Sequence, residues 1–361
     1  MNRWAARYVQ QGDDLPRRLR VSHAAGDPPP APARSAWPWV SNVGGVALVA
    51  GLLWWLGTGP ALAALRRIDA AALVAALLLG AVATVSCAWR WRLVAEGLGV
   101  RLPLGTAVAH CYRSVFLNAT LPGGVLGDVH RAVRHGRDAG DVGRAVRAVV
   151  WERGAGQVIQ VVFAVLLLLA LPSPVRPYLP AAVAVAVAVA LGLVLLVRVL
   201  PRSGPSRGAR ALRAAVADVR AGLLGRRTAP GVLLASVVAV GCHLATFVLA
   251  ARVAGATAPL ADLLPLTLLA LLAMALPANM AGFGPREGMA AWAFGAAGLG
   301  AAQGVSTALV YGALVLVAAL PGAAVLLPRR GRFQFRVRST ARTVNQAGSA
   351  ALPATGLAGS L

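Results

Sequence analysis

The sequence predicts an all-α protein that crosses a membrane several times, and three observations lead to this fold class. Of the 361 residues, 58% are hydrophobic and only 13% are charged, whereas about a quarter of the residues of an average soluble domain are charged. The mean hydropathy of +0.69 likewise fits a chain dissolved in lipid. The charged residues also cluster between long apolar runs, which can pack against each other and against lipid as one membrane domain.

Six apolar segments are long enough to cross a bilayer, which takes about 20 mostly apolar residues. They are residues 39–59, 68–89, 149–171, 178–200, 231–254 and 303–327. Trp54 and Trp55 lie near the end of the first segment, where tryptophan is typical of a membrane interface. The third segment qualifies only if Glu152 and Arg153 are tolerated at its start.

Two further apolar segments are interrupted. Residues 104–121 stop at a Pro-Gly-Gly sequence, and residues 262–276 stop at a proline before a short apolar piece at 289–299. Proline and glycine end helices or leave backbone groups unpaired, which at membrane depth is tolerated only inside protein or beside a wet cavity. The sequence therefore predicts about eight apolar segments in total, two of them broken or re-entrant.

The distribution of arginine predicts the topology, because cytoplasmic loops carry an excess of basic residues. Five strongly basic stretches are expected in the cytoplasm: residues 1–38, 90–101, 131–153, 202–227 and 328–361. The weakly charged loops near residues 66–69, 172–177 and 252–262 would face outward. The net charge of the chain is +23, but the basic residues cluster between apolar spans. Because no nucleic-acid-binding module is recognisable either, we expect no nucleic-acid partner.

The two ends of the chain differ in composition from the middle. Residues 1–38 are rich in charge and proline, and residues 328–361 are basic and then rich in Ala, Gly, Ser and Thr. We expect both to be disordered and cytoplasmic, on either side of an integral membrane domain at 39–327. This organisation predicts a multi-pass protein of the plasma membrane.

The basic loop at 202–227 has an amphipathic pattern of its own. Apolar residues recur at helical spacing from Leu212 to Leu223, while Arg210, Arg213 and Arg220 lie around the other face. Such a pattern predicts a basic helix that lies on the inner leaflet.

The two interrupted segments predict a possible inverted repeat. Residues 104–121 are flanked by cytoplasmic stretches on both sides, and residues 262–299 by outer loops. The sequences at 118–128 and 276–287 each contain Leu-Pro, then glycines, then a carboxylate. Re-entrant hairpins that enter from opposite faces are typical of inverted-repeat transporters. The alternative is eight full spans with a few arginines on the unexpected side.

Charged residues inside a bilayer cost several kcal/mol unless they are paired or hydrated, so they are candidates for function. Arg113 lies in the first interrupted segment, beside His110, Ser114 and Asn118, which share one helical face. These side chains predict a polar wall of a headgroup cavity. Hydrogen bonds between helices are the structural alternative.

The sequence LPGGVLGDVHR after residue 120 combines a chain break with charges. Gly123 and Gly124 let the backbone approach a ligand closely and expose amide donors, next to Pro122. Asp128 and Arg131 are three residues apart and can pair on one face of a helix. A simple helix cap is the alternative to a binding site.

Two adjacent pairs of opposite charge complete the candidates. Glu152 and Arg153 point in different directions, one toward Arg113 or Asp128 and the other toward a phosphate, although Arg153 could also snorkel to the interface. Arg286 and Glu287 precede a short helix predicted at 289–299 and so lie at its N-terminus, which favours anions. Glu287 could instead cap that helix or neutralise another arginine.

These residues carry a resemblance to a known family. The sequences LNATLPGGVLGDVHRA (117–132), WERGAG (151–156) and LPANMAGFGPREG (276–288) resemble the flippase-like transmembrane domain related to the membrane region of lysylphosphatidylglycerol synthases. The similarity covers roughly residues 40–327 and implies an inner-membrane protein that handles or translocates lipids. Full-length synthases continue into a soluble aminoacyltransferase domain. Because a basic tail follows here, we do not expect aminoacyl transfer.

The sequence thus predicts a protein that binds, and flips, an anionic or polyprenyl-phosphate-linked lipid. The alternatives are a membrane-embedded glycosyl- or acyltransferase, using Asp128 or Glu287 as a base, and a scaffold for a separate lipid-synthesising enzyme. No metal-binding, P-loop or nucleophile-elbow motif supports enzyme chemistry, and we expect no cofactor or metal. The residues expected to bind the lipid are Arg113, Asn118, Pro122, Gly123, Gly124, Asp128, Arg131, Glu152, Arg153, Asn279, Gly282, Gly284, Arg286 and Glu287.

Overall fold

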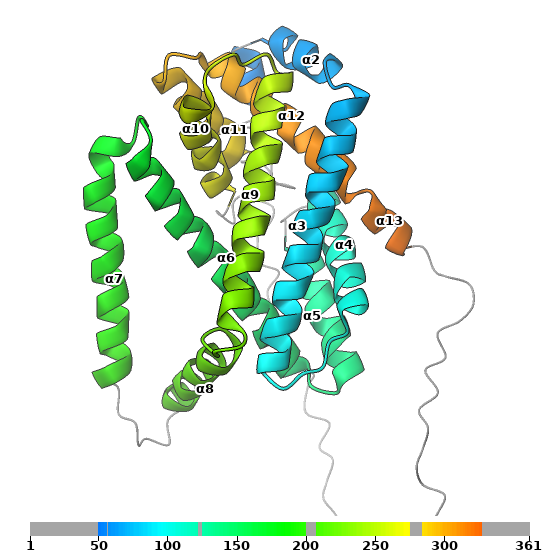
Figure 1. Cartoon of the computed structure of the whole chain (residues 1–361), viewed down its shortest axis with the longest axis vertical. Coiled ribbons are helices and arrows are strands. Elements are labelled where there is room, and N and C mark those ends of the chain that lie inside the picture. The colour runs from blue at the N-terminus through cyan, green and yellow to red at the C-terminus, as the bar shows by residue number, and fades with distance from the viewer. Residues whose placement is uncertain (1–49, 56, 122–124, 200–206, 275–283, 327–361) are drawn as a thin grey trace, which may run out of the picture. The chain divides into compact units, whose positions relative to one another are not determined.

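The computed structural model describes residues 50–55, 57–121, 125–199, 207–274 and 284–326. Within these ranges the regular structure is entirely helical, as the sequence predicts (Figure 1). The predicted terminal regions and most of the predicted first span lie outside the described residues.

Among the described residues, four helical stretches are long and apolar enough to cross a membrane: α3 (Ala70–Gly97), α6 (Val142–Ala170), α9 (Ala229–Val253), and α12 (Ala301–Ala319) together with α13 (Pro321–Leu326). They confirm that the segments predicted at 68–89, 149–171, 231–254 and 303–327 are apolar helices of that length. A helix of this size is about 40 Å long at 1.5 Å per residue, which exceeds the roughly 30 Å of a hydrocarbon core. The fold is therefore that of a multi-pass membrane protein.

Aspartate side chains set the starts of two of these helices. Asp69 accepts a hydrogen bond from the backbone N–H of Ala72 at 2.8 Å, and Asp141 accepts one from Arg144 at 2.8 Å. An N-cap of this kind satisfies an amide that has no partner inside the helix. Because Asp141 caps α6, this helix begins well before the predicted start at residue 149, and Glu152 lies inside it rather than at its opening.

Two pairs of shorter helices occur where the sequence predicts interrupted segments. The first pair is α4 (Leu104–Thr120) and α5 (Leu126–Ala139), and the second is α10 (Leu260–Ala273) and α11 (Pro285–Ala296). In Figure 1 the first pair lies beside the end of α3 that contains Gly97, and the second lies at the opposite end of the bundle. Of these, α4 ends at Thr120 and α10 at Ala273, each shortly before a predicted Leu-Pro sequence.

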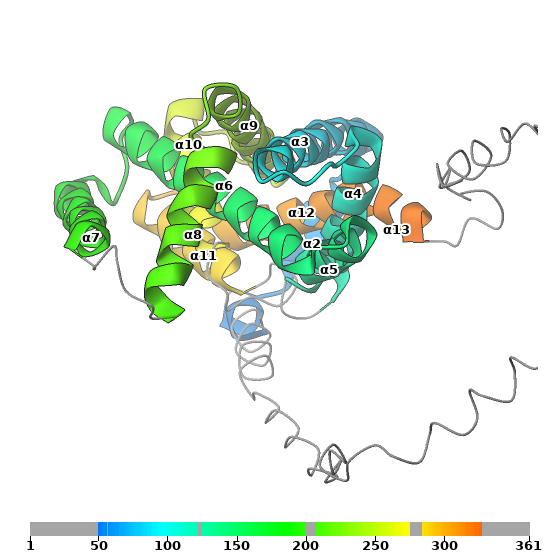
Figure 2. The ribbon, with the colours of Figure 1, turned by 90° about the horizontal axis from the view of Figure 1, so that it is seen from below.

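The remaining helices lie around this bundle. The segment predicted at 178–200 forms α7 (Leu179–Val199), which follows the short turn η3 (Arg176–Tyr178) and stands at the edge of the bundle in Figure 1. The helix α2 (Gly59–Arg66) precedes α3. The predicted amphipathic helix forms α8 (Arg207–Gly222) and, in Figure 2, crosses the bundle while α3 and α9 are seen almost end-on.

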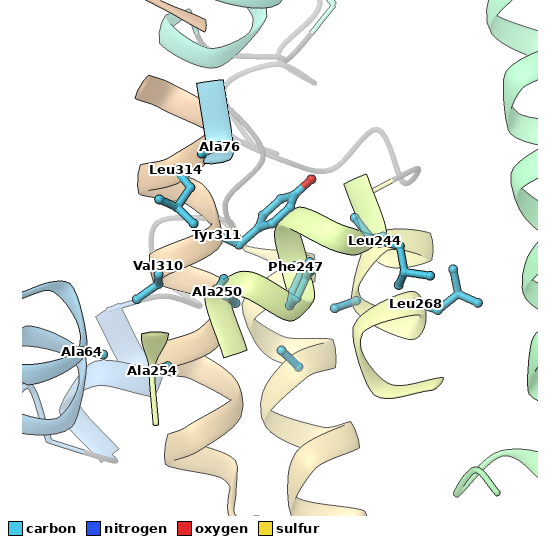
Figure 3. Packing of buried hydrophobic residues seen from close by; sticks show 14 of the residues in the cluster. Ala64, Ala76, Leu244, Phe247, Ala250, Ala254, Leu268, Val310, Tyr311 and Leu314 are labelled. Carbon is cyan, nitrogen blue, oxygen red and sulfur yellow. The ribbon is translucent and has the colours of Figure 1, made fainter. Parts of the chain in front are cut away.

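The core between the long helices is built largely from small residues. Ala76 of α3 and Ala250 of α9 are buried, and close approach of backbones at small residues is the usual way in which membrane helices associate. Phe247 and Tyr311 stack between α9 and α12, with ring centroids 4.5 Å apart (Figure 3). This packing fixes the helices from which the polar side chains described below project.

Candidate functional site

Glu152 of α6 is the centre of a buried ion network. Its Oε1 accepts hydrogen bonds from Nε and Nη2 of Arg90 at 2.9 and 2.5 Å, and its Oε2 accepts one from Nη2 of Arg131 at 2.6 Å. Arg90 also donates to the hydroxyl of Ser236 at 3.0 Å. Glu152 is only 1% exposed, so these charge-assisted bonds replace water. The network joins α3, α5, α6 and α9.

Asp128, in the first turn of α5, is the second carboxylate of the network. It accepts hydrogen bonds from the hydroxyl of Ser114 at 2.9 Å and from Nδ2 of Asn118 at 3.3 Å. Nε of Arg131 lies 2.9 Å from Oδ1, in an ion pair without hydrogen-bond alignment. The pairing of Asp128 with Arg131, predicted from their spacing, is therefore confirmed.

Arg153 is the part of this network that faces outward. Its Nη2 lies 2.5 Å from Oδ2 of Asp128, while 52% of its side chain is exposed. Arg90 and Arg131 are, in contrast, buried. With three guanidinium groups and two carboxylates, the network has an excess of one positive charge.

Gly127 lets α4 and α5 meet at this network. Its backbone N–H donates to Oδ1 of Asn118 at 2.8 Å. A Cβ at this position would lie 2.2 Å from the carbonyl oxygen of Ser114, a separation that side chains do not adopt. Only glycine fits this contact, and Asn118 uses both ends of its amide to connect the two helices.

The ring of Trp91 packs on the guanidinium group of Arg131. Cζ of Arg131 lies 4.8 Å from the ring centroid of Trp91, a cation–π arrangement, and Nη1 contacts Sγ of Cys111 at 3.4 Å. Trp91 also makes edge contacts with the rings of His110 and His135. His110 therefore packs against an aromatic side chain in a buried position.

Arg113 lies apart from the other predicted residues of this region. Its Nη2 donates to the carbonyl oxygen of Val325 at 2.8 Å and thereby ties α4 to α13. In the described part of the chain, the hydrogen bonds and ion pairs of Glu152 and Asp128 do not include Arg113. This placement matches the structural alternative, a hydrogen bond between helices.

Arg286 and Glu287 form a second buried ion pair, at the start of α11. Oε2 of Glu287 accepts a hydrogen bond from the backbone N–H of Gly284 at 2.6 Å, so the carboxylate caps the helix and also pairs with Arg286. Gly284 has φ of 113°, a conformation that favours glycine. Cζ of Arg286 lies 5.2 Å from the ring centroid of Tyr311, whose hydroxyl is 3.3 Å from Nδ1 of His243.

Comparison with known families identifies the chain. The family described as "Lysylphosphatidylglycerol synthase TM region" matches residues 42–322. The chain belongs to this family. The comparisons with curated proteins and with solved structures gave no match.

The three sequences that suggested the lysylphosphatidylglycerol synthase TM-region family supply most of the two ion networks. The first contributes Asn118, Asp128 and Arg131, and the second contributes Glu152 and Arg153. The third contributes Gly284, Arg286 and Glu287. Of the other predicted residues, Pro122, Gly123, Gly124, Asn279 and Gly282 lie outside the described residues.

Sequence reasoning missed Arg90, the main partner of Glu152. Arg90 follows an apolar run together with Arg92, which suggested a position at the interface. Arg92 does pair with Glu96 at an exposed position, but Arg90 turns into the bundle. A Cβ on Gly156 would lie 2.9 Å from the guanidinium nitrogens of Arg90, so glycine at this position leaves room for that side chain.

Proposed function

We propose that the chain binds the anionic headgroup of a membrane lipid at the network around Asp128 and Glu152 and moves that lipid between leaflets. A phospholipid, a modified phospholipid or a polyprenyl-phosphate-linked sugar carries the required phosphate. Membership of a family defined by the membrane region of a lipid-modifying synthase supports a lipid-related role. In this proposal the acyl chains stay in the bilayer while the headgroup contacts the polar network.

The observation that carries the proposal is the position of Arg153. Its guanidinium pairs with Asp128, yet half of the side chain is exposed, so it can offer further N–H donors to a phosphate. The excess positive charge of the network supports an anionic ligand. Glu152, held by Arg90 and Arg131, has the role of fixing the arginines in place.

The order of the helices supports an inverted repeat around this site. A long helix, a short helix, a break, a short helix and a long helix follow each other twice, in α3–α6 and in α9–α12. The two short pairs lie at opposite ends of the bundle in Figure 1. Inverted repeats of this kind commonly have their substrate site at the interface of the halves. Rocking of one half against the other would expose the headgroup to each leaflet in turn.

We place the protein in the plasma membrane, with both termini in the cytoplasm. The positions of the arginine-rich parts of the bundle support this orientation. The end of α3 with the loop after it, the turn region where α5 meets α6, and the segment before α9 lie at one end of the bundle in Figure 1 and carry Arg92 and Arg101, Arg134, Arg137, Arg144 and Arg147, and Arg226 and Arg227. By the positive-inside rule this end is cytoplasmic. The first short pair, α4 and α5, would then enter from the cytoplasm.

The contacts of the two carboxylates favour binding over catalysis by a membrane-embedded transferase. A general base must be able to take up a proton from its substrate. Asp128 is surrounded by Ser114, Asn118 and two arginines, and Glu287 by Arg286 and the Gly284 amide. Both carboxylates are thus already engaged by donors of the protein itself, which fits a binding and positioning role.

Transport of a labelled lipid by reconstituted protein tests the proposal. Vesicles that contain the purified chain and fluorescent phosphatidylglycerol should expose the label to an impermeant quencher faster than empty vesicles. We expect Arg153→Gln to slow this step roughly tenfold or more, because a hydrogen bond to a charged group contributes about 1.5–3 kcal/mol.

Arg92→Gln is the matched control, since it removes an arginine from an exposed ion pair with Glu96. It should transport lipid at the rate of the unmodified chain. Thermal unfolding in detergent, measured in parallel, separates a loss of transport from a loss of folded protein. Equal transport rates for folded Arg153→Gln and unmodified protein would refute the role of Arg153.

A further inference from the structure

The helix α8 connects the basic end of the bundle to the candidate site. It lies across the long helices in Figure 2 and packs against α3 and α6. A helix that lies across the direction of α3 and α9, at one end of them, has the orientation of an interfacial helix in the plane of the membrane.

The outward face of α8 is strongly basic. Arg210, Arg213 and Arg220 are exposed, and Arg226 and Arg227 are exposed in the following turn, before α9 enters the membrane segment. A row of arginines at this level is complementary in charge to the anionic phospholipids of a leaflet. The surface of α8 therefore fits a membrane partner.

The one acidic residue of α8, Asp218, turns the other way, toward α6. Its Oδ2 accepts hydrogen bonds from Nε of Arg147 at 2.7 Å and from Nε1 of Trp151 at 3.3 Å. Trp151 directly precedes Glu152 and Arg153 in α6. Asp218 thus connects α8 to the turn of α6 that carries the candidate site.

The C-terminal end of α8 is fixed against the end of α3. A Cβ on Gly97 would lie 2.7 Å from the carbonyl oxygen of Ala221, and a Cβ on Gly222 would lie 2.5 Å from Leu98. This close approach leaves little room for α8 to slide along α3. Binding at the outer face of α8 can therefore affect α3 and α6, the two helices that α8 contacts.

We infer that α8 binds the anionic phospholipid surface of the leaflet at this end of the bundle and that this binding regulates the headgroup site through Asp218 and Trp151. The inference rests on the proposed function of that site. Contact with anionic lipid adds to the attachment of α8 at α3, and Asp218 then restrains the adjoining turns of α6, so that Arg153 is positioned for a phosphate. In a neutral bilayer this restraint is weaker.

Amide hydrogen exchange of the full chain in nanodiscs tests the inference without relying on transport. Discs of phosphatidylcholine alone are compared with discs that also contain phosphatidylglycerol. Phosphatidylglycerol should slow exchange roughly tenfold or more both in α8 and in the α6 segment at 147–156, because several arginines contribute to the attachment. The variant R210Q/R213Q/R220Q should lose both effects, and R101Q/R137Q/R144Q, with the same change of charge elsewhere, should keep them.

Asp218→Ala separates docking from regulation, because it should keep the slower exchange in α8 and lose it at 147–156. Trp151→Phe, which removes the indole N–H but keeps an aromatic ring, should do the same more weakly. Exchange in α8 that does not respond to phosphatidylglycerol overturns the docking surface and leaves room for a soluble acidic partner. Slower exchange at 147–156 that persists in Asp218→Ala overturns the connection and shows lipid bound at the site itself. A failure of transport alone, with these patterns intact, counts against the proposed function and not against the role of α8.

Discussion

Glu152 places a carboxylate inside one of the apolar helices, where an unpaired charge would cost several kcal/mol. Two guanidinium groups from other helices supply three hydrogen bonds to it. Removing one partner of a buried ion pair is far more harmful than removing an exposed one, because the remaining charge stays buried. The stability of the bundle and the geometry of the candidate site therefore depend on the same residue.

We predict that Glu152→Gln lowers the free energy of unfolding by about 3–5 kcal/mol, since Arg90 and Arg131 lose their shared counter-charge. Thermal unfolding of the purified protein in detergent measures the change. Glu96→Gln removes a carboxylate from the exposed pair with Arg92 and should cost less than about 1 kcal/mol. Equal melting temperatures for Glu152→Gln and Glu96→Gln would contradict the central role of Glu152.

At the scale of the helices, the sequence predicted where helices end better than it predicted which side chains pair between helices. The end of α4 was predictable because proline and glycine stop helices, and the start of α11 because Pro285 follows glycine. The early start of α6 was missed although Asp141 is a typical N-cap residue. The pairing of Arg90 with Glu152 was not predictable, because the two side chains belong to helices that are far apart in the chain and spacing within one helix holds no information about the other.

The contact between α4 and α5 gives the second prediction. Gly127→Ala would bring a Cβ to 2.2 Å from the Ser114 carbonyl oxygen, so the two helices must separate and Asp128 must shift. We expect a loss of about 1–3 kcal/mol in stability, as for other overpacked contacts, together with slower lipid transport. Thermal unfolding and the vesicle assay measure the two effects.

Gly154→Ala is the matched control for this helix contact, because no atom lies within 4 Å of a Cβ at that position of α6. Alanine there should leave the free energy of unfolding unchanged or raise it by up to about 1 kcal/mol, since alanine has a higher helix propensity than glycine. If both alanine variants behave alike, the close approach at Gly127 does not determine the packing of α4 on α5.

At the scale of the whole molecule, composition and arginine distribution were sufficient to predict a helical, multi-pass membrane protein, and the family match agrees with the resemblance found in three short sequences. Hydropathy could not decide how the shorter helices are arranged, since α10 and α11 are each too short to cross a bilayer alone. The arrangement of the short helices depends on how each packs against its partner, which the pattern of apolar residues does not reveal. The proposed orientation of the bundle rests on the distribution of charge alone and is open to a direct test.

Labelling of single cysteines in intact cells tests this orientation. Thr257→Cys and Arg176→Cys lie in exposed loops at the end with few arginines, and Ala139→Cys and Arg227→Cys lie at the basic end. An impermeant maleimide should label the first two in intact cells and the last two only after permeabilisation, because basic loops stay in the cytoplasm. The unmodified chain is the blank, since Cys111 and Cys242 are buried and Cys87 is partly buried. Labelling of Ala139→Cys and Arg227→Cys in intact cells would reverse the orientation, and α4 and α5 would then enter the membrane from outside.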